Sequence, residues 1–242
     1  MKKLTVLAVA VAFMLGAGNV FALPVVPGDN GNEPTLQEIF DTTITGGTLD
    51  AYNDQSEVGV WYEAEANVDA YFVKMFRGDS GNLGIYSKST GFEYDFSLGS
   101  DDTVGFGVND AGDLWVDGAL VEADFGDTFG FYWRNTSVPL MSYTEDEKNA
   151  VGTGYGDSNT LALRYLVKDG LSVATELNGG STIAADGNND WILAFEDRVN
   201  GDGDFNDAVF YIEDMNAVPE PGTLLLLGAG LLGLVGLRKR MQ

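Results

Sequence analysis

The chain has 242 residues, with 13 Lys plus Arg against 37 Asp plus Glu, a formal net charge of −24, and neither cysteine nor histidine. So acidic a surface repels phosphates, which argues against nucleic acid and anionic lipid as partners. The missing cysteines and histidines exclude disulfides, thiol nucleophiles, the Ser-His-Asp triad and the usual zinc sites.

The N-terminus has the three parts of a secretory signal. Lys2 and Lys3 are basic, residues 4–17 are apolar, and Val20-Phe21-Ala22 is a small-residue cleavage site. We therefore expect a signal peptide over residues 1–22, cleavage after Ala22 and an exported protein. Without both termini, residues 23–218 contain eight basic and 36 acidic residues, a net charge of −28. Divalent cations are the expected neutralisers of this charge.

The rest of the chain has the pattern of an all-β protein. Residues 23–34 predict a flexible leader, and Pro34 predicts one short helix over residues 35–40. Residues 62–70 and 92–98 alternate apolar and polar side chains, which indicates half-buried antiparallel strands. Further short strands are predicted between turn-forming clusters, at residues 104–108, 114–116, 129–133 and 161–167.

These elements favour an antiparallel β-sandwich, with a jelly roll as one variant. The folded part divides into residues 35–125 and 126–217, either as one domain or as two closely packed halves. A turn-forming cluster at residues 109–113 (Asn-Asp-Ala-Gly-Asp) predicts a hairpin turn rather than a metal site.

An acidic loop lies between two continuous apolar runs at residues 191–195 and 208–212. Unbroken apolarity indicates strands buried on both faces. The loop holds five carboxylates and one arginine, and such oxygen-rich loops suit Ca²⁺. The expected metal donors are Asp197, Asn200, Asp202, Asp204, Asn206 and Asp207. The alternative is an acidic turn in which Asn and Asp bond their own backbone.

The loop departs from a helix-flanked calcium loop, because Arg198 takes the place of the first acid and Val209 that of the final glutamate. Instead, F-E-D at residues 195–197 followed by D-G-D-F-N-D-A-V at residues 202–209 resembles the closing signature of a family of exported bacterial proteins, the domain of unknown function numbered 4114. The resemblance covers roughly residues 126–213 and implies no chemistry.

The C-terminus consists of Pro219-Glu220-Pro221, an apolar run over residues 224–237 and Arg238-Lys239-Arg240. As a helix, this run spans about 21 Å, short of the roughly 30 Å hydrocarbon core. The three basic residues predict a cytoplasmic stop-transfer signal. Together these parts resemble the PEP-CTERM sorting signal of exported bacterial proteins.

This second resemblance implies an exosortase-type processing enzyme as partner and a transient inner-membrane span through the tail. It also implies a final location in the cell envelope, on the outer surface or in the extracellular matrix of a Gram-negative-type bacterium. The sequence leaves open whether the processed terminus is anchored or released.

Three functions fit these features. We expect a non-enzymatic surface or matrix protein, associated with exopolysaccharide or biofilm and stabilised by Ca²⁺. The first alternative is a carbohydrate-binding module that uses Trp61, Trp115 or Trp133 for stacking, although tryptophans in strand-like sequence usually belong to the core. The second is a glycoside hydrolase with two catalytic carboxylates. Acidic residues are too abundant here to single out a catalytic pair.

Overall fold

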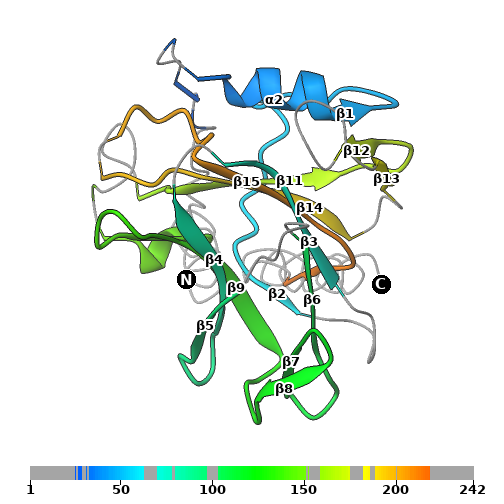
Figure 1. Ribbon diagram of the computed structural model, residues 1–242, viewed down its shortest axis with the longest axis vertical. Helices are drawn as coiled ribbons and strands as arrows, with labels where there is room; N and C mark the ends of the chain where they lie inside the picture. The colour runs from blue at the N-terminus through cyan, green and yellow to red at the C-terminus, as the bar shows by residue number, and fades with distance from the viewer. Residues whose placement is uncertain are drawn as a thin grey trace, which may run out of the picture. The chain divides into compact units, whose positions relative to one another are not determined.

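The structure of the protein is a computed structural model in which residues 24–218 form one compact unit (Figure 1). The residues that it describes are 25, 27–28, 31, 33–62, 70–77, 80–96, 103–150, 152, 159–174, 182–185, 189–199 and 201–218. The predicted signal peptide with Ala22 lies outside these residues. So do the sorting motif Pro219-Glu220-Pro221 and the basic cluster Arg238-Lys239-Arg240.

In the part of this unit that the structure describes, the strands form three antiparallel sheets. The largest has the strand order β11-β14-β15-β3-β6-β7-β8, the second has β16-β2-β9-β4-β5 with β10 also paired to β9, and the third has β1-β12-β13. Within these sheets, every pairing of neighbouring strands is antiparallel, which confirms the expected all-β class. The strands are β1 (Ile44–Thr45), β2 (Trp61–Tyr62), β3 (Ala70–Arg77), β4 (Gly81–Ser87), β5 (Glu93–Asp95), β6 (Thr103–Val108), β7 (Leu114–Val116), β8 (Ala119–Glu122), β9 (Thr128–Asn135), β10 (Met141–Tyr143), β11 (Ala162–Val167), β12 (Ser172–Ala174), β13 (Thr182–Ala184), β14 (Asp190–Phe195), β15 (Ala208–Ile212) and β16 (Asn216–Ala217).

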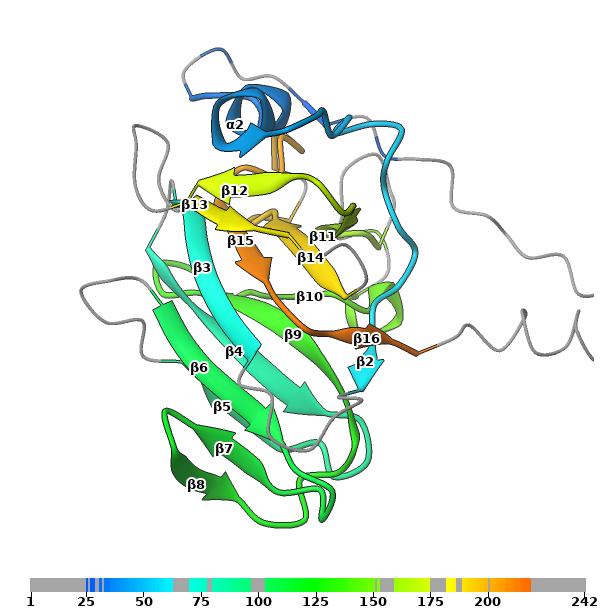
Figure 2. The same ribbon diagram turned by 90° about the vertical axis from the view of Figure 1, so that its right-hand side faces the viewer.

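β14 and β15 are buried on both faces, as their apolar runs predict. Trp191 and Leu193 of β14 point into one hydrophobic core, whereas Ile192 and Ala194 point into a second core. This part of the largest sheet is therefore a middle layer. The six-stranded sheet covers one of its faces, and α2 with the small sheet covers the other (Figure 2).

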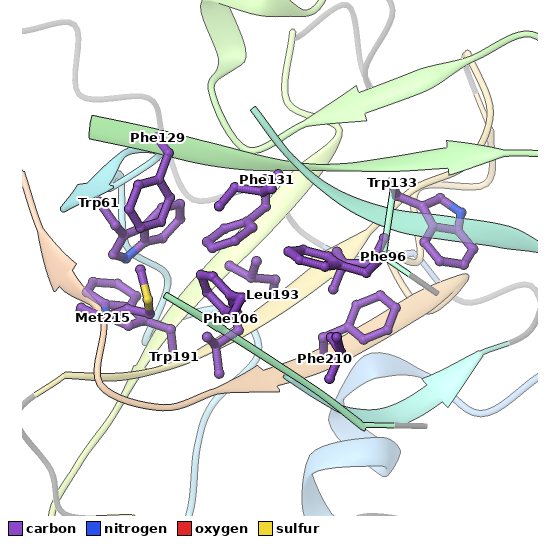
Figure 3. Packing of buried hydrophobic residues seen from close by; sticks show 14 of the residues in the cluster. Trp61, Phe96, Phe106, Phe129, Phe131, Trp133, Trp191, Leu193, Phe210 and Met215 are labelled. Carbon is purple, nitrogen blue, oxygen red and sulfur yellow. The ribbon is translucent and has the colours of Figure 1, made fainter. Parts of the chain in front are cut away.

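The first core is aromatic and joins the two large sheets (Figure 3). Phe131 of β9 meets Phe106 of β6 edge to face, with ring centroids 5.9 Å apart. Trp133 lies 5.7 Å from Phe210, again measured between ring centroids. These contacts confirm the β-sandwich, because facing rows of apolar side chains are what hold two sheets together.

The helix α2 (Leu36–Thr43) covers the second core. Its N-cap is Thr35, whose side chain accepts a hydrogen bond from the backbone N–H of Glu38, while the Glu38 side chain accepts one from the Thr35 N–H. This capping box fixes the helix start one residue beyond the expected position. Pro34 therefore precedes the cap.

Most predicted strands are present, with small shifts of their ends. The alternating segment 62–70 is described only at Tyr62 and Ala70, and β5 covers the middle of the segment 92–98. The sequence analysis missed β4, all of β3 except Ala70, and the short strands β1, β8, β10, β12, β13 and β16. Both halves of the chain contribute to both large sheets, because β15 pairs with β3 and β9 pairs with β4. A short 3₁₀ helix, η1, spans Asp146–Lys148.

Candidate metal centre

The acidic loop spans residues 196–207 and connects β14 to its neighbour β15. Phe195 at the end of β14 pairs with Ala208 at the start of β15, so one ladder holds both ends of the loop. All residues of both strands are buried. The loop is therefore anchored in the middle layer of the fold, which limits where its side chains can lie.

Three carboxylates of this loop are almost completely shielded from water. Glu196, Asp197 and Asp204 are each 1% exposed. Asp202 is exposed and Asp207 is half-buried. Arg198 places its Nε 3.5 Å from Asp197 Oδ1, but its side chain is 67% exposed. Burial of ionised carboxylates is costly, and a bound cation or a proton would reduce this cost.

The carboxylates form two groups of three that share Glu196. We call Glu196, Asp202 and Asp204 the outer group, and Glu196, Asp197 and Asp207 the inner group. Within each group, one carboxylate oxygen per residue lies within 4.8 Å of the others. Oxygens that bind one Ca²⁺ at about 2.3–2.6 Å are at most roughly 5 Å apart. Each group therefore has the spacing of a cation ligand set.

Backbone amides orient these carboxylates. Glu196 Oε1 accepts a hydrogen bond from Arg198 N at 3.3 Å, and its Oε2 accepts one from Gly203 N at 3.0 Å. Asp207 Oδ2 accepts one from Asp197 N at 2.8 Å. A carboxylate oxygen has two acceptor sites, so these bonds fix the side chains and leave capacity for a cation.

Asn206 adds a buried oxygen that has no donor. Its Nδ2 donates to Pro34 O at 2.7 Å, and its backbone N donates to Asp204 Oδ1 at 3.2 Å. Its Oδ1 is buried without a hydrogen-bond partner among the described residues. A buried acceptor left unsatisfied costs about 1–3 kcal/mol. A cation bound beside Asp204 is the kind of partner that would remove this cost.

Contacts from the six-stranded sheet also hold the loop. Asn135 at the end of β9 donates from its side chain to Asp197 Oδ2. Ser142 of β10 donates from Oγ to the backbone oxygen of Glu196 at 2.6 Å. The loop therefore connects the middle layer to the six-stranded sheet.

Glycines allow close approach on two sides of the loop. A Cβ on Gly201 would lie 2.2 Å from Glu196 Oε1. On the leader, Gly28 N donates to Gly203 O at 2.7 Å, and a Cβ on Gly28 would lie 2.3 Å from Asp202 O. The leader therefore runs directly against the outer part of the loop, where a larger residue than glycine would clash.

The carboxylates lie in an environment that disfavours their charge. Burial raises the pKa of Asp204 to about 6, with Asp202 and Glu33 adding repulsion. Burial also raises the pKa values of Glu196 and Asp207 above their usual range, and negative neighbours raise them further. Without a cation, the loop therefore retains protons at pH values where free carboxylates have lost them.

All the donors assembled here are oxygens, which are the ligands of hard cations. Ca²⁺ accepts six to eight oxygens in irregular geometry, whereas Mg²⁺ demands a near-ideal octahedron and keeps several waters. An irregular loop of carboxylates and one amide oxygen suits the larger ion better. The donor set could therefore hold a hard divalent cation.

The structure brings together most of the residues that the sequence analysis selected. Asp197, Asp202, Asp204 and Asp207 fall into the two groups, and Asn206 lies against Asp204. Asn200 lies outside the described residues.

Two residues at this centre were missed. Glu196 was counted among the loop carboxylates but not among the donors, although its position directly after a buried strand was a usable signal. Asn135 is 62 residues from Asp197, and no local pattern connects them.

The structure also places the turn cluster and the three tryptophans that the sequence analysis selected. Residues 109–113 form the turn of the β6–β7 hairpin, where Asn109 Oδ1 accepts from two backbone amides. Trp61 and Trp133 are completely buried and cannot stack on a sugar, which corrects the interpretation of these two as binding platforms. Trp115 is 38% exposed.

Two segments of the chain match known families. Residues 124–214 match the domain of unknown function DUF4114. Residues 217–240 match the PEP-CTERM protein-sorting motif. Both resemblances expected from the sequence are thereby confirmed. No curated protein and no solved structure matches the chain.

The sorting motif identifies an exported protein of the Gram-negative cell envelope that an exosortase-type enzyme processes. In the part of the chain that the structure describes, no helix is long and apolar enough to span a membrane. The predicted tail span is outside that part.

Proposed function

We propose that this exported protein is a non-enzymatic component of the outer surface or extracellular matrix, stabilised by Ca²⁺ and associated with exopolysaccharide. The observation that carries the proposal is the acidic loop, where Glu196, Asp197 and Asp204 are each 1% exposed and lie in groups with ligand spacing. A protein sorted to the envelope meets calcium at concentrations that weak sites can use, since extracellular modules bind it at about 10⁻⁴–10⁻³ M.

The charge of the exported body supports the matrix role. Residues 23–218 have a net charge of −28, so the surface attracts divalent cations and, through them, acidic polymers. The loop carboxylates accept bonds from backbone amides and are largely buried, which suits a structural metal site better than a reaction centre. A structural role for the cation fits a protein that acts by binding and assembly.

A deletion of residues 219–242 tests the sorting half of the proposal in the native host. We expect the truncated protein to be missing from its normal envelope location and the matrix to lose cohesion. Chelation of Ca²⁺ should release the intact protein from the matrix in the same assay. A normal location together with unchanged matrix properties after deletion contradicts the proposal.

Carbohydrate binding at Trp115 is a second candidate function, favoured by one observation. Trp115 lies between Gly107 on β6 and Leu120 on β8, and Leu120 is 50% exposed. Gly107 places no side chain beside the indole, and an exposed aromatic ring can stack on a sugar ring. A glycan-binding screen with the native protein and with Trp115→Ala tests it. Binding that the substitution leaves unchanged contradicts this candidate.

A further inference from the structure

We infer that the acidic loop holds two divalent cations side by side, with Glu196 as the bridging ligand. This inference rests on the cation binding in the proposed function and adds the number of ions and the assignment of residues to each. Asp202 and Asp204 belong to the outer ion. Asp197 and Asp207 belong to the inner ion.

The spacing of the carboxylates argues for two ions instead of one. The five carboxylates do not form a single group within the 4.8 Å limit, and only Glu196 belongs to both groups. Because ligands of one Ca²⁺ lie within roughly 5 Å of each other, a single ion cannot contact all five carboxylates in this arrangement. A single ion would leave one group with its charge unbalanced.

The charge balance leads to the same number. Counted over the five carboxylates and Arg198 alone, two divalent cations give a net charge of zero, whereas one cation gives a net charge of −2. The residues of the unbalanced group would include a carboxylate that is only 1% exposed, whichever group is left empty. Burial of ionised carboxylates is unfavourable, and a cation at each position would reduce this cost, so occupation of both positions is favoured.

The bridging role follows from the way in which Glu196 is held. Its two oxygens accept from different parts of the loop, Oε1 from Arg198 N and Oε2 from Gly203 N. Each oxygen thus keeps a free acceptor site in a different direction. Glu196 is therefore oriented to give one oxygen to each ion.

Each position has an additional fixed partner. Beside the outer group, Asn206 Oδ1 is buried without a hydrogen-bond partner among the described residues, while its side-chain amide donates to Pro34 O and its backbone N donates to Asp204 Oδ1. At the inner position, the amide of Asn135 orients Asp197 from the neighbouring sheet. The Asn206 oxygen supports the outer ion independently of the acidic residues, because it is neutral, buried and without a hydrogen-bond partner among the described residues, and a bound cation would satisfy it.

The test is the number of Ca²⁺ ions bound by residues 24–218, the compact unit that contains both cores. Calorimetric titration and native mass spectrometry of metal-free protein measure it. We expect two ions per chain. A single ion contradicts the two-ion inference and leaves the proposed function intact, whereas no binding overturns both.

Substitutions at the two ends of the cluster assign the ions. Asp202→Asn should remove the outer ion and Asp207→Asn the inner ion, with one ion remaining in each case. Glu196→Gln should raise both dissociation constants by at least about tenfold, since affinity depends on ligand charge. Asp110→Asn, in the exposed β6–β7 turn, is the matched control and should still bind two ions.

A single shared site gives a different pattern, in which Asp202→Asn and Asp207→Asn each abolish all binding. That pattern contradicts the inference. Circular dichroism of each metal-free variant checks that it is folded. If Asp207→Asn does not fold, the exposed Asp202→Asn variant decides alone, because it must retain one ion.

Discussion

Glu196 shows how a single residue can be both destabilising and necessary. It follows the last residue of a strand that is buried on both faces, so its carboxylate enters the protein interior. In the metal-free state its charge is opposed by burial and by Asp202 and Asp204. A bound cation converts the same group from an electrostatic cost into a ligand. Proton and cation therefore compete for this loop.

This competition gives a pH prediction for the metal-free protein. Burial raises the pKa of Asp204 from 3.8 to about 6, and the pKa values of Glu196 and Asp207 are raised too. Groups with a raised pKa bind more protons in the folded than in the unfolded state, so the free energy of unfolding falls as pH rises through the folded pKa. We expect metal-free protein to melt at a lower temperature at about pH 8 than at about pH 5.

Ca²⁺ should counteract the loss of stability at high pH, because deprotonated carboxylates bind the cation more tightly. The increase in melting temperature on adding Ca²⁺ should therefore be larger at about pH 8 than at about pH 5. Glu196→Gln removes one titrating group and should flatten the metal-free pH profile. A metal-free melting temperature that rises between these pH values contradicts the assignment.

At the scale of elements, the leader and the loop hold each other. Val25 exchanges two hydrogen bonds with Gln55, from Val25 N to Oε1 at 3.0 Å and from Nε2 to Val25 O at 2.7 Å. Further along, Gly28 N bonds Gly203 O. The segment expected to be a flexible leader is thus attached at these described positions, and one attachment point is the acidic loop itself.

Deletion of residues 24–33 should therefore weaken both the fold and cation binding. At least the three hydrogen bonds just described are lost, at roughly 1 kcal/mol each. For a domain of this size, about 3 kcal/mol corresponds to a melting temperature lower by about 6–12 °C. Thermal unfolding with and without Ca²⁺ measures the effect.

Gly28→Ala is the local version of this experiment. Its Cβ would meet Asp202 O at 2.3 Å, so it should lower Ca²⁺ affinity without removing the leader. Unchanged melting and unchanged Ca²⁺ response in both variants would show that the leader does not support the loop.

The strands that could be predicted from sequence are those in which the pattern of apolar residues reflects the burial of their side chains. β14 and β15 are continuous apolar runs because they form a middle layer, and the acidic loop is visible between them. β4 gave no such signal. Gly84 on β4 lies under the ring of Tyr132, and Gly130 on β9 lies under Tyr86. Glycines on one strand are thus covered by tyrosines of the neighbouring strand. The sequence of either strand alone therefore lacks a regular alternation of apolar and polar residues.

The arrangement of the metal centre was likewise only partly predictable. Spacing along the loop indicated oxygen donors, but the division into two groups depends on how the loop folds back toward Glu196. The supports from Asn135, Ser142 and Pro34 come from distant parts of the chain. Such contacts arise from the tertiary fold and leave no trace in local sequence.

On the scale of the whole molecule, the matched family segment is not a self-contained fold. Residues 124–214 supply β9 through β15, but β9 pairs with β2 and β4, and β15 pairs with β3. The aromatic core also draws Trp61, Ile85 and Phe106 from the preceding part of the chain. The two halves therefore complete each other's sheets.

We expect residues 124–214 expressed alone to lack a cooperative thermal transition, because their central strands lose partners and the core loses Trp61, Phe96 and Phe106. Calorimetry of this fragment beside residues 24–218 measures the difference. Adding Ca²⁺ should not restore the transition. A fragment that melts cooperatively would contradict the interdependence of the two halves.

Whether the acidic loop is a structural cation site is tested most directly by a thermal melt of residues 24–218 in chelator, in Ca²⁺ and in Mg²⁺. With dissociation constants near 0.1 mM, about 10 mM Ca²⁺ adds roughly 2.7 kcal/mol of stability for each ion bound. Each bound ion should then raise the melting temperature by about 5–11 °C, with a smaller effect of Mg²⁺ and at most about half the effect of Ca²⁺ on Glu196→Gln, whose sites are at least about tenfold weaker. Equal melting temperatures in chelator and in Ca²⁺ would contradict the claim and leave the loop an acidic turn.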